Sequence, residues 1–88
     1  MRIDIHPRIR ERHPELSEED VRAAWQGYAM RALRSTLERE VRIGHDGRGR
    51  QIEMIGARTM EGWLVFHAMT PPSKKTIREI DSLRRNRS

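Results

Sequence analysis

The sequence predicts an α+β fold, in which N-terminal helices and a C-terminal helix pack on a three-stranded antiparallel meander. Residues 39–69 are rich in β-branched and aromatic side chains, and the turn signals Asp46-Gly47 and Met60-Glu61-Gly62 divide them into three runs. Apolar residues on both sides of this stretch recur at helical spacing. We therefore expect strands at about residues 40–46, 50–59 and 62–69.

Length and composition predict a single domain over residues 1–88. Apolar and charged residues each make up 35% of the chain, but the apolar residues are periodic, which favours a folded chain over a disordered one. The chain has no cysteine, which excludes a disulfide framework and a thiolate metal site. No apolar run has the length of a signal-sequence core or a membrane span, so we expect a cytoplasmic protein. A small core without cross-links favours completion by a partner or a second copy.

The positive charge of the chain is concentrated at its C-terminal end. Residues 74–88 carry six basic and two acidic side chains, which accounts for +4 of the formal net charge of +5. Two interpretations stay open at this point. The basic end contacts a polyanion or an acidic protein surface, or it is a solvated, frayed terminal helix.

The clearest helix start predicts a helix from about residue 18 to residue 34. Ser17 is a natural N-cap, and Asp20 stands at the capping-box position. Leu16 and Val21 have the spacing of a hydrophobic staple. The apolar face of this helix comprises Val21, Ala24, Trp25, Tyr28 and Ala32. We expect both aromatic residues of that face to be buried against the sheet.

The two ends of the chain carry weaker signals. Residues 1–6 form either a short edge strand or a loose arm, and residues 8–12 form one helical turn between two prolines. After the sheet, two consecutive prolines break the chain, and Ser73 can cap a final basic helix over residues 73–88. A narrow apolar stripe on this helix comprises Ile77, Ile80 and Leu83.

Sequence motifs exclude several kinds of site. The chain has no Walker loop, dinucleotide fingerprint or zincin motif. The glycines at 44, 47 and 49 are better explained as hairpin residues, because no helix follows them. His45 and Asp46 are adjacent on a strand end and point in opposite directions, which disfavours a shared metal. We expect no metal and no cofactor.

Several segments together resemble a known family. They are RHPELSEEDV at 12–21, VRIG at 41–44, GR at 49–50 with IEMI at 52–55, and WLVFHAM at 63–69 leading into KKTIRE at 74–79. In this order they are similar to the BrnT-type toxins of the RelE-like ribonuclease group, which belong to bacterial type II toxin–antitoxin pairs. The chain differs from that pattern at Pro14, where the family has a glycine, and at residues 69–73, where the family has an Arg-Ile-Ile-Ser-Ala-Arg segment.

The resemblance implies a toxin-like, metal-independent endoribonuclease that a small antitoxin neutralises. In such a reaction the RNA 2′-hydroxyl attacks the adjacent phosphate, arginines stabilise the developing charge, and a histidine or lysine moves protons. The implied catalytic residues are His67, Arg50, Arg58 and Lys74, in a basic cleft where the second and third strands meet the last helix. The implied nucleic-acid contacts are Arg48, Lys75, Arg78 and His13. The implied partners are RNA and a cognate antitoxin protein. Apolar residues on both sides of the third strand also indicate, as a further option, a second copy in a homodimer.

The alternative is a non-catalytic module on the same scaffold that binds nucleic acid or a protein partner. The position of His67 bears on this choice, because strict alternation in the third strand sets two groups of side chains on opposite faces. The first group comprises Leu64, Phe66 and Ala68. The second group comprises Trp63, Val65, His67 and Met69. We expect the first group to face the helices, since a histidine beneath a helix would need a buried hydrogen-bond partner. That choice puts His67 on the open face of the sheet.

Overall fold

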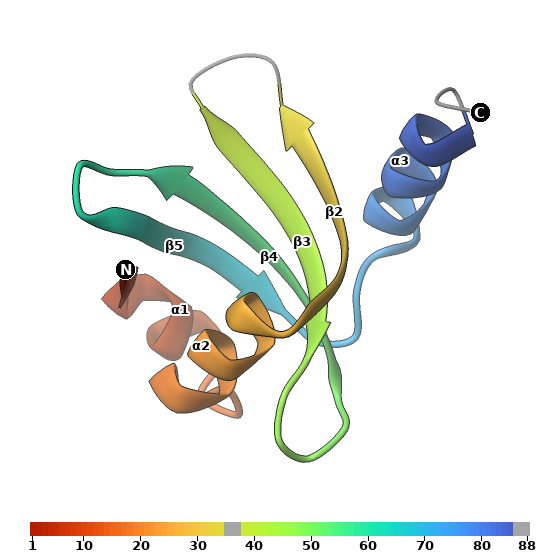
Figure 1. Ribbon diagram of the computed structural model, residues 1–88. Helices are drawn as coiled ribbons and strands as arrows, with labels where there is room; N and C mark the ends of the chain where they lie inside the picture. Colours follow the sequence, from red (N-terminus) through yellow and green to blue (C-terminus); the bar gives the residue numbers. More distant parts are fainter. Residues whose placement is uncertain (35–37, 86–88) are drawn as a thin grey trace.

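One five-stranded mixed sheet, with helices on both of its faces, forms the framework of the protein. The computed structural model describes residues 1–34 and 38–85. The strands lie in the order β1-β5-β4-β3-β2; β1 runs parallel to β5, and the other neighbours are antiparallel. Along the chain (Figure 1) the elements are β1 (Arg2–Ile5), α1 (Pro7–Arg12), α2 (Glu18–Gln26), β2 (Tyr28–Arg34), β3 (Arg39–His45), β4 (Gln51–Arg58), β5 (Gly62–Met69) and α3 (Lys74–Arg85).

The predicted three-stranded antiparallel meander is wrong as an architecture. Its three strands are present as β3, β4 and β5, but β2 extends the sheet on one side and β1 extends it on the other. The parallel pairing of β1 with β5 makes the sheet mixed, with Ile5 opposite Val65. Of the two alternatives for residues 1–6, the structure has the edge strand.

The second helix begins as predicted and ends earlier than predicted. The Ser17 hydroxyl accepts a hydrogen bond from the Asp20 N–H, and the Asp20 carboxylate accepts one from the Ser17 N–H, which completes a capping box. The helix stops at its C-cap Gly27, and the next residues form β2, paired with β3. The predicted helix over 18–34 is therefore wrong after residue 26. Trp25 is fully buried as expected, whereas Tyr28 on β2 is 38% exposed.

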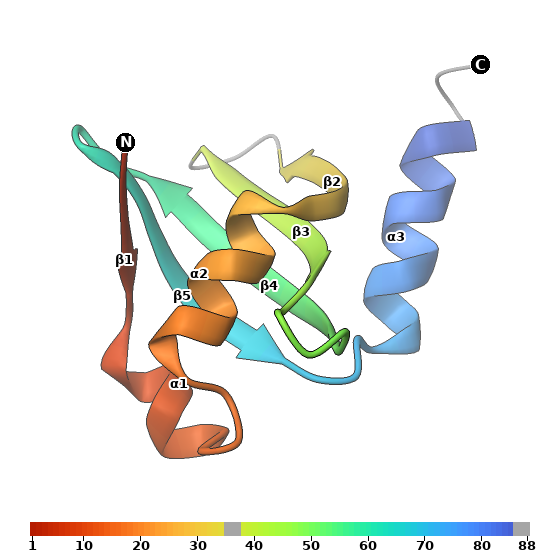
Figure 2. The same cartoon turned by 60° about the horizontal axis from the view of Figure 1, so that its bottom comes forward.

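The main core lies between the sheet and the first two helices, which sit together on one side (Figure 2). Trp25 packs edge-on against Trp63, with ring centroids 5.2 Å apart. Gly56 on β4 allows this packing, since a Cβ atom there would lie 2.6 Å from the Trp25 ring. The rest of this core comprises Ile3, Ile5, Ile9, Leu16, Val21, Ala24, Ile52, Met54, Val65 and Ala68.

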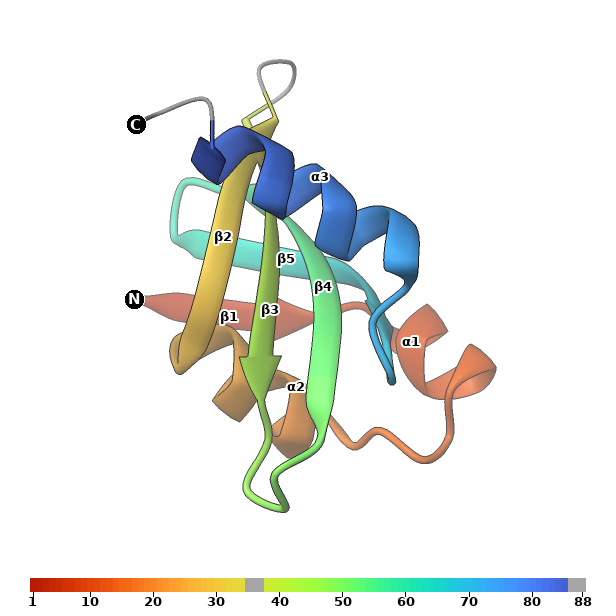
Figure 3. The same cartoon turned by 90° about the vertical axis from the view of Figure 1, so that its right-hand side faces the viewer.

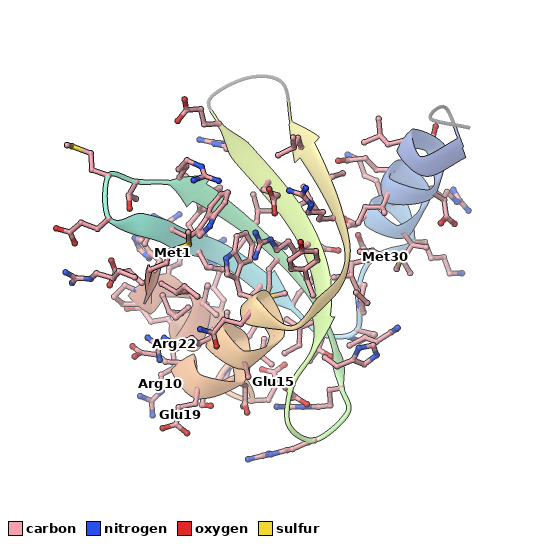
Figure 4. The ribbon with its side chains drawn as sticks, viewed as in Figure 1. Met1, Arg10, Glu15, Glu19, Arg22 and Met30 are labelled. Atoms are coloured by element: carbon pink, nitrogen blue, oxygen red, sulfur yellow. The ribbon has the colours of Figure 1, made fainter. Side chains whose placement is uncertain are left out.

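A smaller core lies on the opposite face, where α3 crosses the sheet near β2 (Figure 3). Ile80 is fully buried there against Ala32, Val41 and Ile43. Met30 points from β2 toward α3 (Figure 4) and packs at the edge of this cluster. Ser73 caps the helix, as predicted, because its hydroxyl accepts a hydrogen bond from the Thr76 N–H.

A β-bulge in β5 breaks the alternation of its side chains. Ile55 on β4 pairs with His67, and the next residue of β4 pairs with Val65, so Phe66 is the extra residue. Trp63 and Val65 pack in the α2-side core, which contradicts the expectation that they face away from the helices, whereas Ala68 packs there as expected. His67 still lies on the opposite face, but the bulge puts it there.

Within the described residues, the structure has no helix whose length and apolar character would suit it to cross a membrane.

Candidate functional site

A polar arrangement joins β4, β5 and the start of α3. The Nε2 atom of His67 lies 2.8 Å from the Oε2 atom of Glu53. The other Glu53 oxygen accepts hydrogen bonds from the Ser73 N–H at 2.9 Å and the Ser73 hydroxyl at 2.8 Å. Glu53 is only 4% exposed, whereas about a third of the His67 side chain is exposed. A buried carboxylate therefore fixes one ring nitrogen of a histidine that remains open to solvent.

The charge of Glu53 is stabilised by its donors. Burial acts to raise the pKa of Glu53, but the hydrogen bonds from Ser73, His67 and Thr76 lower it by more, so that its pKa lies below the ordinary value. The carboxylate is thus ionised at neutral pH. An ionised carboxylate favours the tautomer of neutral imidazole that carries its proton on Nε2.

A small pocket of about 80 Å³ opens beside His67. Its lining residues come from α1 and the residue after it, and from β5; they are Arg8, Ile9, Arg12, His13, Phe66, His67 and Ala68. Arg8 and Arg12 are four residues apart on α1, so they share one helix face. His13 is the C-cap residue of α1 and lies 3.8 Å from Glu15 through its Nδ1 atom. The residues that line the pocket thus include two histidines, two arginines and a phenylalanine.

Two of the residues implied by the sequence, His67 and His13, meet in this pocket. Lys74 is the first residue of α3 and follows Ser73, which binds Glu53. It is exposed, as are Lys75 and Arg78 further along the helix. Among the implied catalytic residues, Lys74 is therefore adjacent in sequence to Ser73, which contacts Glu53.

Arg50 lies elsewhere and has a structural role. Its guanidinium donates to Asp46 at 2.7 Å, to Asp20 at 3.1 Å and to the Glu15 carbonyl at 3.2 Å. Burial acts to raise the pKa of Asp46, but hydrogen bonds from Arg50 and Arg48 leave it below the ordinary value. Arg50 therefore ties the β3–β4 hairpin to the start of α2.

The other implied arginines also lie away from the pocket. Arg58 is exposed, and its guanidinium lies 4.6 Å from the centroid of the Trp63 ring, on the α2 side of the sheet. It is eight positions from Arg50 along an extended strand, which corresponds to about 26 Å at about 3.3 Å per residue. Arg48 is exposed in the β3–β4 turn, where its N–H donates to Asp46. Arg50, Arg58 and His67 therefore do not line one cleft.

Sequence reasoning missed four residues of the arrangement. Arg8 and Arg12 carried a signal, since they are spaced four apart in a short helix that ends at a histidine. No sequence signal identified Glu53, because a carboxylate that alternates with apolar residues is typical of the solvent-exposed face of a strand. Phe66 faced the wrong way in the prediction because the bulge was not anticipated.

The part of the chain that the structure describes contains no group of three or more His, Asp or Glu side chains arranged to hold a metal ion. Comparison of the chain with protein families, with curated proteins and with solved structures gave no match.

Proposed function

We propose that the protein is an endoribonuclease that cleaves RNA in the pocket between α1 and β5. The observation that carries the proposal is the 2.8 Å contact of His67 with the buried Glu53, at the wall of a pocket that also holds His13, Arg8 and Arg12. Two histidines can move protons near neutral pH, and two guanidinium groups can bind a phosphate. This combination suits the cleavage of an RNA phosphodiester.

His67 is the general base in this mechanism. With the Nε2 proton directed at Glu53, the free lone pair of neutral His67 is on Nδ1. Nδ1 takes the proton of the RNA 2′-hydroxyl as the 2′-oxygen forms a bond to the adjacent phosphorus. The Glu53 carboxylate accepts the Nε2 hydrogen bond before and after this transfer, so Glu53 acts as a positioning residue.

Arg8, Arg12 and His13 complete the reaction. The two guanidinium groups bind the non-bridging phosphate oxygens, on which negative charge grows in the transition state. The bond from phosphorus to the 5′-oxygen then breaks, and the leaving oxygen takes a proton from protonated His13. The products are a 2′,3′-cyclic phosphate and a 5′-hydroxyl, with one proton moved from the 2′-oxygen to the 5′-oxygen overall.

The resemblance of the sequence to BrnT-type toxins supports the same activity. We extend the proposal to the toxin half of a toxin–antitoxin pair, which acts in the cytoplasm and is neutralised by a small protein. The formal charge of +5 suits both RNA and an acidic partner.

The experiment is an RNA cleavage assay in the presence of a chelator. The wild-type protein should cleave single-stranded RNA, and His67→Ala should lose about 10²–10³-fold in rate. Arg58→Ala is the matched control, because this exposed cation lies on the other face of the sheet and should keep the wild-type rate. RNA binding that weakens with salt, without cleavage, would instead identify a binding module.

A further inference from the structure

Phe66 lines the proposed reaction site and also contacts an exposed arginine, Arg39. Phe66 is half-buried and lines the same pocket as His67. The Cζ atom of Arg39 lies over the same ring, 5.0 Å from its centroid. Arg39 comes from β3, two strands away, so the contact reaches across β4 on the α3 side of the sheet.

The register of the sheet explains how Arg39 reaches the ring. Arg39 pairs with Ala57 on β4, and Ala57 pairs with Leu64 on β5. The methyl side chain between the two strands leaves room for a long side chain to lie over β4. The bulge at Phe66 sends its ring to this face, next to His67 instead of opposite to it.

We propose that Phe66 and Arg39 form a stacking platform for one base of a single-stranded RNA, beside the phosphate that is cleaved. The inference rests on the proposed function, which puts that phosphate in the neighbouring pocket. Aromatic rings and guanidinium planes are the two kinds of side chain on which proteins stack unpaired bases. Both kinds of side chain are present here, and Phe66 is adjacent in sequence to His67, the proposed general base.

The same geometry defines the class of substrate. A base inside a duplex is stacked on its neighbours, so it cannot lie flat on a protein side chain unless it is first extruded. A base in a single strand or a loop is free to do so. The platform therefore selects single-stranded RNA, and it holds the nucleotide next to the scissile phosphate at the mouth of the pocket.

The test uses a short 2′-O-methyl RNA oligonucleotide, which lacks the attacking hydroxyl and cannot be cleaved. Fluorescence anisotropy with this probe should show weaker binding by Phe66→Leu, by about 5- to 100-fold, because a leucine keeps apolar volume and loses the ring. Phe66→Trp should bind as tightly as the wild type. Tyr28→Leu is the matched control, since this exposed aromatic residue lies on the α2 side and should not affect binding. The same probe annealed to its complement should bind at least tenfold more weakly.

Three results would overturn the platform: equal binding by wild type and Phe66→Leu, equal binding of single strand and duplex, or no binding of the probe at all. In the last case the half-buried apolar face is left for a protein partner. If the wild-type protein cleaves RNA and Phe66→Leu binds the probe as tightly as the wild type, the platform is rejected and the proposed nuclease activity stands. If binding of the probe depends on Phe66 but the protein cleaves no RNA, the proposed nuclease activity is rejected and the platform stands. Circular dichroism of each variant checks that it folds.

Discussion

His67 and Glu53 contact one another across β5 and β4, with 2.8 Å between Nε2 and Oε2, and Ser73 at the start of α3 holds the same carboxylate. The orientation of the imidazole therefore depends on three elements that meet at one point. Because Glu53 is buried and ionised, replacing it alters the histidine without touching a bound substrate.

Glu53→Gln should lower kcat for RNA cleavage by on the order of 10²-fold or more, with little change in KM. An amide can still accept the Ser73 bonds, but its NH₂ group favours the wrong tautomer of His67. Initial rates over a range of RNA concentrations separate kcat from KM. Glu61→Gln, at an exposed carboxylate in the β4–β5 turn, should leave both constants unchanged. A Glu53→Gln enzyme with normal kcat would refute the positioning role.

Arg50→Ala should destabilise the fold and leave kcat unchanged at temperatures where the protein is folded. The reason is that Arg50 joins the β3–β4 hairpin to the start of α2 through Asp46, Asp20 and the Glu15 carbonyl, away from the pocket. A thermal melt should give a lower Tm than wild type. A loss of kcat comparable with that of His67→Ala, at unchanged Tm, would place Arg50 in the reaction instead.

The free energy of unfolding should fall as the pH is lowered. Glu53, Asp46 and Asp20 each have a pKa below the ordinary values of 4.5 for Glu and 3.8 for Asp. Unfolding restores the ordinary values, so the unfolded chain binds more protons in this range. The stabilisation is fully present above these ordinary values, and it is lost as the pH falls through the lower values of the folded protein.

Urea unfolding at pH 6 and pH 3 measures this acid dependence. Asp46→Asn should show a smaller difference between the two pH values than the wild type, because one depressed carboxyl group is gone. Asp81→Asn, at an exposed position of α3, should show the wild-type difference. The interpretation fails if Asp46→Asn keeps the full difference.

Two glycines test the packing of α2 on the sheet. A Cβ atom at Gly44 would lie 2.0 Å from the Ala24 carbonyl oxygen, whereas a Cβ atom at Gly47 would meet no atom within 4 Å. Gly44→Ala should therefore cost at least about 2 kcal/mol of unfolding free energy. Gly47→Ala should change it by less than about 0.5 kcal/mol. Denaturant titrations of the two variants compare them directly, and equal stabilities would contradict the close contact of α2 with β3.

Local signals in the sequence predicted local structure well. The capping box of Ser17 and Asp20 and the cap at Ser73 both act within three residues, so residue type and spacing are enough to identify them. The Asp46-Gly47 turn likewise separates β3 from β4 where the sequence indicates it.

The rest depends on contacts between residues that are distant in sequence. Tyr28 and Ala32 continue the helical repeat of α2, and only pairing with β3, as between Met30 and Ile43, turns this segment into a strand. The parallel pairing of Ile5 with Val65 carries α1 to the end of β5 and so builds the pocket. Glu53 is buried because Ser73 returns over it 20 residues later. Periodicity in one segment contains none of this information.

The most direct test of the nuclease is to identify the RNA ends that the protein produces in the presence of a chelator. We predict a 2′,3′-cyclic phosphate and a 5′-hydroxyl from wild-type protein, formed about 10²–10³-fold more slowly by His67→Ala and by His13→Ala, and at the wild-type rate by Arg58→Ala. Ends of another chemistry, or the same rate from wild type and His67→Ala, would contradict the proposed reaction at this pocket.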